Sequence, residues 1–143
     1  MNTMKIYLAG AMSGLSYEDQ IKWRSNVRDA ILYGGYDYEI KPRFFSPPEY
    51  YPIEEPVHKS EREAMQFDLN ALRKSDLVVV NFNAPNSLGT MAELAIAYEN
   101  RIPIVGLNKD GVELHPWIIE FCTRICDDMY ELVEHITSHY LNF

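Results

Sequence analysis

The sequence predicts a single doubly wound α/β domain, residues 1–143, in which about five parallel strands carry helices on both faces. Short apolar runs recur at strand spacing, and segments with helical periodicity lie between them. The run at 76–82, DLVVVNF, is continuous and β-branched, as expected of a strand buried on both faces. Strands that alternate with helices imply crossover connections, and these join parallel strands.

The strands are predicted from apolar runs bounded by turn residues. The first run ends at Gly10, and the last is a short edge strand around Ile125. In chain order, the predicted strands are 6–9, 36–40 or 44–45, 76–82, 103–107 and the segment around 125.

The helices are predicted from their capping signals. Ser16 is placed to cap one helix, which Gly34 and Gly35 end, and Ser60-x-x-Glu63 is a capping box that opens another. The predicted helices run from 16 to about 32, from 60 to about 73, and from about 127 to 139. Another follows the loop at 83–89 and ends at about 100, and a further turn is expected after Pro116.

Composition excludes several classes of function. The net charge of -8 disfavours binding to a nucleic acid polymer, which requires a basic face, although a helix N-terminus can still hold a small anion. No apolar stretch approaches 18 residues and no cleavable leader precedes the first strand, so we expect a cytoplasmic protein.

No metal site and no cofactor are predicted. Cys122 and Cys126 are four residues apart and are expected to share a helix face. Because His115 alone does not complete a ligand set with them, we interpret them as buried thiols.

Ligands of open parallel sheets bind beyond the carboxyl ends of the strands. Three loops are expected to meet there: residues 10–14, the proline-rich segment 46–56 and residues 83–89. The 10–14 loop, GAMSG, matches neither the dinucleotide fingerprint nor a Walker loop. It is either a tight turn or a floor that lets a ligand approach the backbone.

Residues 86–94, NSLGTMAEL, lead into a helix whose first N–H groups favour an anion. Ser87 and Thr90 offer hydroxyl groups, and Gly89 permits a close approach. Glu93 has two interpretations. Thr90-x-x-Glu93 is itself a capping box, but the same turn lies where this fold gathers its ligands.

Asp68 is the second carboxylate of interest. It falls on the apolar stripe of the helix that Ser60 opens, between Phe67 and Ala71. An acid in that position needs a partner or a function, so it either pairs with Arg73, lies on a solvated flank, or acts in a site.

Three segments together resemble the nucleoside 2-deoxyribosyltransferase superfamily. They are KIYLAGAMSGL at 5–15, FDLNALRKSDLVVVNF at 67–82, and NSLGTMAELAIAY at 86–98 followed by RIPIVGL. The resemblance implies a flavodoxin-like enzyme that cleaves the N-glycosidic bond of a 2′-deoxynucleoside or its 5′-monophosphate. The covalent glycosyl intermediate is resolved by water in hydrolases and by a second nucleobase in transferases.

The resemblance also implies roles for particular residues. Glu93 would attack C1′ of the sugar, and Asp68 would assist at the base. The residues implied to bind the substrate are Tyr7, Gly10, Met12, Ser13, Ser87, Gly89 and Thr90. Members of the family are usually homo-oligomers with shared pockets, and the segment 114–121, LHPWIIEF, is a candidate contact.

The sequence departs from the transferase pattern at Ser87, where transferases carry an aspartate. A hydroxyl favours a phosphate, which a carboxylate would repel, so Ser87 indicates the branch that hydrolyses nucleotides. The 10–14 loop holds no arginine, and Arg24 or His115 would have to supply the positive charge. The alternative hypothesis is a non-catalytic nucleotide-binding or sensing module on the same fold.

Overall fold

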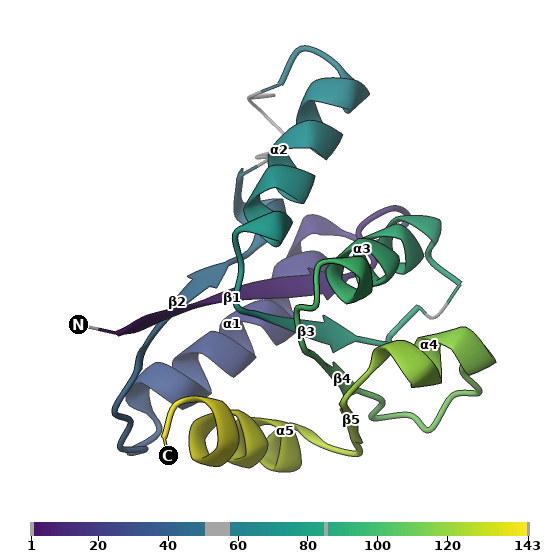
Figure 1. Ribbon diagram of the computed structural model, residues 1–143. Coiled ribbons are helices and arrows are strands. Elements are labelled where there is room, and N and C mark those ends of the chain that lie inside the picture. Colours follow the sequence, from purple (N-terminus) through teal and green to yellow (C-terminus); the bar gives the residue numbers. More distant parts are fainter. Residues whose placement is uncertain (1, 51–57, 85, 143) are drawn as a thin grey trace.

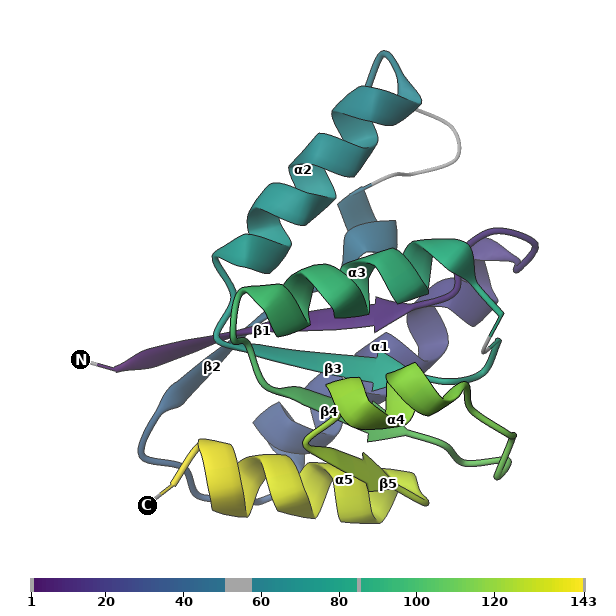
Figure 2. The same ribbon diagram turned by 45° about the vertical axis from the view of Figure 1, so that its right-hand side comes forward.

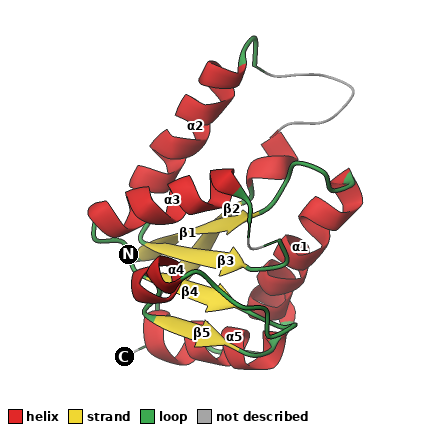
Figure 3. Ribbon diagram, turned by 90° about the vertical axis from the view of Figure 1, so that its right-hand side faces the viewer, coloured by secondary structure: helices red, strands yellow, loops and turns green. Residues whose placement is uncertain are grey.

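Five parallel strands form one sheet, in the order β2-β1-β3-β4-β5, as the sequence predicts (Figures 1 and 3). The computed structural model describes residues 2–50, 58–84 and 86–142. The strands are β1 (Thr3–Gly10), β2 (Lys41–Phe45), β3 (Leu77–Asn81), β4 (Ile104–Leu107) and β5 (Arg124–Cys126). The topological switch point lies between β1 and β3, where the connections leave in opposite directions.

Helices cover both faces of the sheet (Figures 1 and 2). They are α1 (Tyr17–Tyr33), α2 (Glu61–Arg73), α3 (Leu88–Glu99), α4 (Pro116–Phe121) and α5 (Met129–His135). One apolar core packs α1 and α5 against Ile6, Leu8 and their neighbours, and the other packs α3 and α4 against Tyr7, Ala9 and theirs. Alternate residues of β1 thus serve opposite cores, as a doubly covered strand requires.

Helix α2 differs from the others because only its carboxyl-terminal part reaches the core. Leu72 is its one buried residue, while Met65 and Phe67 are exposed. The helix therefore stands away from the sheet, with its amino-terminal half projecting above α3 (Figure 2). Its start is the predicted capping box, in which Ser60 Oγ accepts from the Glu63 N–H at 3.2 Å.

Of the two predicted positions of the second strand, 36–40 and 44–45, the structure agrees with the second, since β2 occupies Lys41–Phe45. The N–H groups of Glu39 and Ile40 both donate to the carbonyl oxygen of Leu141 at 3.0 Å. This long-range pairing keeps the segment 36–40 out of the sheet, and no local pattern indicates it. Pro42 is tolerated because β2 is an edge strand.

The carboxyl-terminal third also differs in detail. Helix α5 begins after its cap Asp128 and continues as the π-helix η2 (Ile136–Tyr140). The expectation that Cys122 and Cys126 share a helix face is wrong, because Cys122 ends α4 and Cys126 lies in β5. The intervening β5 is the predicted edge strand.

The proline-rich segment 46–56 is described only in part. Residues Pro47–Tyr50 form a 3-10 turn, η1, and residues 51–57 lie outside the described ranges.

Within the described ranges, no helix combines the length and the apolar character that a membrane crossing demands.

Within residues 2–50, 58–84 and 86–142, Arg101 is the non-glycine residue with a left-handed backbone, at φ 58°, where it ends α3. Its N–H donates to the Tyr98 carbonyl at 3.0 Å, and the Ile102 N–H donates to the Ala97 carbonyl at 2.9 Å. This is a helix end that glycine favours.

We expect Arg101→Gly to stabilise the protein by about 0.5–1 kcal/mol in urea unfolding. The matched control is Asn100→Gly at φ -88°, which should give no gain. Equal effects of the two changes would contradict this explanation.

Candidate active site

A cavity of about 1320 Å³ opens at the carboxyl ends of β1 and β3, between α2 and the start of α3. Three segments line it: the loop after β1, the loop that leads from β3 into α3, and the amino-terminal part of α2. This is the switch point of the sheet, where the loops after β1 and β3 diverge and leave room for a ligand. The volume exceeds that of a typical small-molecule pocket.

The structure brings all nine predicted site residues to this cavity. Eight of them line it: Gly10, Met12, Ser13, Asp68, Ser87, Gly89, Thr90 and Glu93. The ninth, Tyr7, is fully buried in β1 beneath the cavity, and its hydroxyl donates a hydrogen bond to Oε2 of Glu93. Residues from β1, α2 and α3, far apart in the sequence, thus converge on one point.

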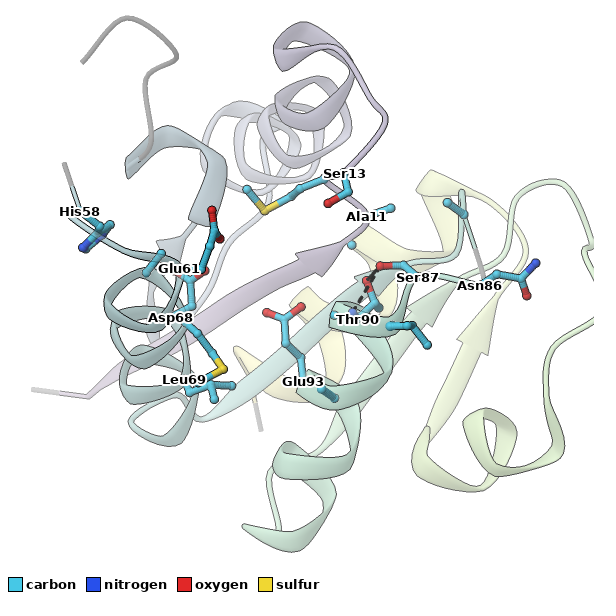
Figure 4. A pocket seen from close by; sticks show the side chains of 18 of the residues that line it. Ala11, Ser13, His58, Glu61, Asp68, Leu69, Asn86, Ser87, Thr90 and Glu93 are labelled. Carbon is cyan, nitrogen blue, oxygen red and sulfur yellow. Dashed lines mark hydrogen bonds between the residues drawn. The ribbon is translucent and has the colours of Figure 1, made fainter. Parts of the chain in front are cut away.

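Glu93 is not a capping residue. The N-cap of α3 is Ser87, whose Oγ accepts from the Thr90 N–H at 3.4 Å, so the helix begins at Leu88, one turn before Glu93. The predicted Thr90–Glu93 capping box is therefore wrong. The carboxylate is free of the helix start and points into the cavity between Asp68 and the Ser87–Thr90 turn (Figure 4). Among the described residues only Tyr7 bonds it, which leaves Oε1 available.

The environment of Glu93 raises its pKa to about 7. The largest cause is desolvation, because protein atoms surround the carboxyl group although the residue keeps partial exposure to the cavity. The hydrogen bond from Tyr7 lowers the pKa, the like charge of Asp68 raises it, and the positive charge of Arg24 lowers it. A carboxylate with a perturbed pKa in a cleft is typical of a functional group.

Asp68 lies on α2, across the cavity from the Ser87–Thr90 turn (Figure 4). It is half-buried, and of its predicted environments the structure therefore favours the site. Its effect on the pKa of Glu93 places the two carboxyl groups within electrostatic reach of each other. The cavity thus holds a pair of acids on opposite elements.

The start of α3 offers hydrogen-bond donors to the cavity. Ser87 Oγ accepts from Thr90 Oγ1 at 3.1 Å as well as from the Thr90 N–H, so the hydrogen of the Ser87 hydroxyl remains to be donated. The N–H groups of Leu88 and Gly89 precede the first bond of the helix ladder. A Cβ on Gly89 would meet nothing within 4 Å, so this side of the turn is open.

Neither of the residues predicted to supply positive charge to the cavity, Arg24 and His115, lines it. Arg24 is fully buried and bonds backbone carbonyls, and His115 caps α4 through a bond from the Trp117 N–H at 3.1 Å. Among the described residues, the basic side chains that line the cavity are His58 and Lys59.

Sequence reasoning missed His58 and Lys59, together with Glu61 and Asn86, which also line the cavity. The signal that could have indicated His58 and Lys59 is their position between the proline-rich segment and the capping box of α2, and Glu61 lies within that box.

Comparison with known proteins identifies the family of this chain. The profile of the family described as nucleoside 2-deoxyribosyltransferase like matches residues 3–111. The chain therefore belongs to the nucleoside 2-deoxyribosyltransferase-like family. A search among curated proteins finds no match.

Solved structures share the fold at low sequence identity. A conserved protein from Enterococcus faecalis V583 has a TM-score of 0.72 at 20% identity, with 94% of this chain and 97% of that chain covered. The 2-deoxyribosyltransferase from Bacillus psychrosaccharolyticus has a TM-score of 0.71 at 19% identity, with 90% of each chain covered. A CMP N-glycosidase from Clostridium botulinum has a TM-score of 0.58 at 16% identity, with 92% of this chain and 96% of that chain covered.

The raised pKa of Glu93 makes stability depend on pH. Between the ordinary value of 4.5 and about 7, the folded protein holds a proton that the unfolded chain has released, so stability falls as the pH rises through this range. We therefore expect Glu93→Gln to stabilise the protein at pH 8 by about 2 kcal/mol, and by nearly nothing at pH 5. Urea unfolding at the two pH values measures this difference.

The matched control is Glu99→Gln at the exposed end of the same helix, for which no such pH-dependent gain is expected. A gain from Glu93→Gln that is equal at pH 5 and pH 8 would show that burial of the charge is not its cause.

Proposed function

We propose that this protein cleaves the N-glycosidic bond of a 2′-deoxynucleoside or its 5′-monophosphate, with Glu93 as the nucleophile. The observation that carries the proposal is the carboxylate of Glu93, directed into the cavity and bonded at one oxygen by Tyr7. The membership of the chain in the nucleoside 2-deoxyribosyltransferase-like family supports the same chemistry.

In the first step, the free oxygen of Glu93 attacks C1′ of the sugar and the bond from C1′ to the base nitrogen breaks. The electron pair of that bond leaves with the base, and the sugar remains as an ester of Glu93. Two easier displacements replace one difficult displacement at an oxocarbenium-like centre, as in retaining glycosidases. The Tyr7 hydroxyl orients the nucleophile and leaves Oε1 free to react.

A nucleobase leaves well only when its ring is protonated or accepts a hydrogen bond as the glycosidic bond breaks. Asp68 lies on the opposite element and is the group we assign to this end of the substrate, either directly or through a water molecule. In the second step, water or a second nucleobase attacks C1′ and releases Glu93. The cavity of about 1320 Å³ has room for either acceptor.

The 5′ end of the substrate is assigned to the start of α3. The Ser87 hydroxyl and the N–H groups of Leu88 and Gly89 can donate to a phosphate, and the positive end of the helix dipole favours its charge. The Clostridium protein that shares this fold is a CMP N-glycosidase, which supports a nucleotide substrate. We therefore favour the 5′-monophosphate over the free nucleoside.

A panel of deoxynucleosides and their 5′-monophosphates, incubated with and without a free base and analysed by chromatography, tests the reaction. We expect base release to fall about a thousandfold or more in Glu93→Ala, because no other group replaces the nucleophile. Glu99→Ala, on the same helix, is the control and should keep full activity. Base release that persists in Glu93→Ala would falsify the mechanism, and binding without turnover in the native protein would favour the sensing module.

The choice between nucleoside and nucleotide is tested by Ser87→Asp. Aspartate caps a helix as well as serine does, so α3 should be retained. The new carboxylate repels a phosphate, and we expect kcat/KM for the 5′-monophosphate to fall about tenfold or more relative to that for the nucleoside. Ser87→Asn, which caps without charge, separates repulsion from the loss of the hydroxyl. An unchanged ratio in Ser87→Asp would place the phosphate elsewhere.

We further propose that the protein forms a homo-oligomer in the cytoplasm. Trp117 and Ile119 of α4, in the predicted contact segment, are 67% and 50% exposed, and Leu88 at the start of α3 is 85% exposed. Large apolar side chains exposed on the surface indicate an interface. Sedimentation analysis should detect a dimer or larger species, and Trp117→Lys should shift the population toward monomer. A native protein that sediments as a monomer would contradict the proposal.

A further inference from the structure

Arg24 is a buried cation whose bonding partners are backbone carbonyls. It lies on α1 with 0% exposure, and it pairs with no carboxylate of the described residues. Its Nε donates to the Leu8 carbonyl at 3.1 Å, one terminal nitrogen donates to that of Gly10 at 3.1 Å, and the other to that of Gln20. A buried guanidinium without an acid is costly, so its position calls for an explanation.

The two strand carbonyls belong to the part of β1 that has no neighbour in β2. The last pair between these strands is Tyr7 with Phe45, and Leu8 and Gly10 lie beyond it. Arg24 therefore supplies the donors that a longer β2 would supply, and its planar fork suits two carbonyls at this spacing. The guanidinium also lies 4.9 Å from the ring centre of Trp23, and a Cβ on Gly10 would be 3.0 Å from that ring.

The strand that Arg24 holds is the strand that positions Glu93. Tyr7, next to Leu8, donates its hydroxyl to the Glu93 carboxylate, and Gly10 lines the cavity. A shift of the end of β1 would move the hydroxyl and the cavity floor together. Arg24 is thus connected to the carboxylate through two adjacent residues of β1: it bonds the Leu8 carbonyl, and Tyr7 bonds Glu93.

Three groups affect the pKa of Glu93: the Tyr7 hydroxyl from β1, Asp68 from α2 and Arg24 from α1. His58, Lys59 and Glu61 also line the cavity that Glu93 faces. Strands β3 and β4 carry no titratable side chain, and Glu120 of α4 lies with Tyr98 and Arg101 at the other end of α3. Burial lowers the pKa of Arg24 to about 10, against the attraction of Glu93, so the guanidinium stays charged at neutral pH.

We propose that Arg24 is a positioning residue for Glu93, which rests on the role of Glu93 in the proposed function. Its guanidinium holds the end of β1 where the Tyr7 hydroxyl meets the carboxylate, and its positive charge behind the cavity favours the ionised, nucleophilic form of Glu93. It acts without touching the substrate, because it does not line the cavity.

The test compares Arg24→Gln and Arg24→Lys with Arg28→Gln, the matched control. Arg28 lies one turn further along α1 and bonds Glu49 at 2.9 Å. The pKa of Glu93 is followed by the carboxyl signal of carbon-13 glutamate in each protein, assigned with Glu93→Gln. The pH profile of kcat/KM for base release is measured in parallel.

We expect Arg24→Gln to raise the pKa of Glu93 and the acid limb of the profile by about one unit, which lowers kcat/KM about tenfold on that limb. Arg24→Lys should keep the pKa, because the charge remains, but lose about tenfold in kcat, because an ammonium does not bond both carbonyls in the fork geometry. Arg28→Gln should leave both quantities unchanged.

An unchanged Glu93 titration in Arg24→Gln overturns the electrostatic role, and full kcat in Arg24→Lys overturns the positioning role. If Arg24→Gln does not fold, Arg24→Lys still tests the proposal, since a changed pKa of Glu93 in that variant contradicts it. If the native protein releases no base, the proposed function fails, while the carbon-13 titration still tests the effect of Arg24 on Glu93.

Discussion

The hydrogen bond from Tyr7 to Glu93 is the interaction on which the site depends. It joins strand β1 to helix α3 across one of the two cores, and it does so with a carboxylate in a desolvated position. A buried acid without a donor would not stay ionised. The tyrosine hydroxyl offsets part of the desolvation and at the same time fixes the direction of the side chain.

The rest of the site follows from the need to bring a ligand to that carboxylate. The switch point between β1 and β3 leaves an opening, and Gly10 and Gly89 are among the residues that line it. The second acid, Asp68, comes from α2, which stands away from the sheet and forms the opposite wall (Figures 2 and 4). This helix is anchored by Leu72, Leu69 and Ala71 at the core and by Phe67, whose ring packs against Phe45 and Tyr50.

At Glu93, the charge state that favours the stability of the fold is not the one that the proposed reaction needs. A carboxyl group with a pKa near 7 destabilises the fold when it is ionised, yet the proposed attack on C1′ needs that form. The protein keeps the acid in its central cavity, beside a tyrosine and within reach of a buried arginine. Such local conflict is expected at functional sites and is rare elsewhere in a fold.

The sequence by itself determined the class of fold and the five strands, and it predicted nine site residues that the structure gathers at one cavity. Continuous runs such as Leu77–Asn81 and the caps Ser16 and Ser60 are local signals, which near neighbours set through periodicity and capping. Only the tertiary structure decided the position of β2, since the N–H groups of Glu39 and Ile40 donate to the Leu141 carbonyl, and the choice of Ser87 as the cap of α3. It also decided the pairing of Glu93 with Tyr7, 86 residues away, and the burial of Arg24 behind the cavity. These features rest on contacts between distant segments, and their energy exists only once the sheet has assembled.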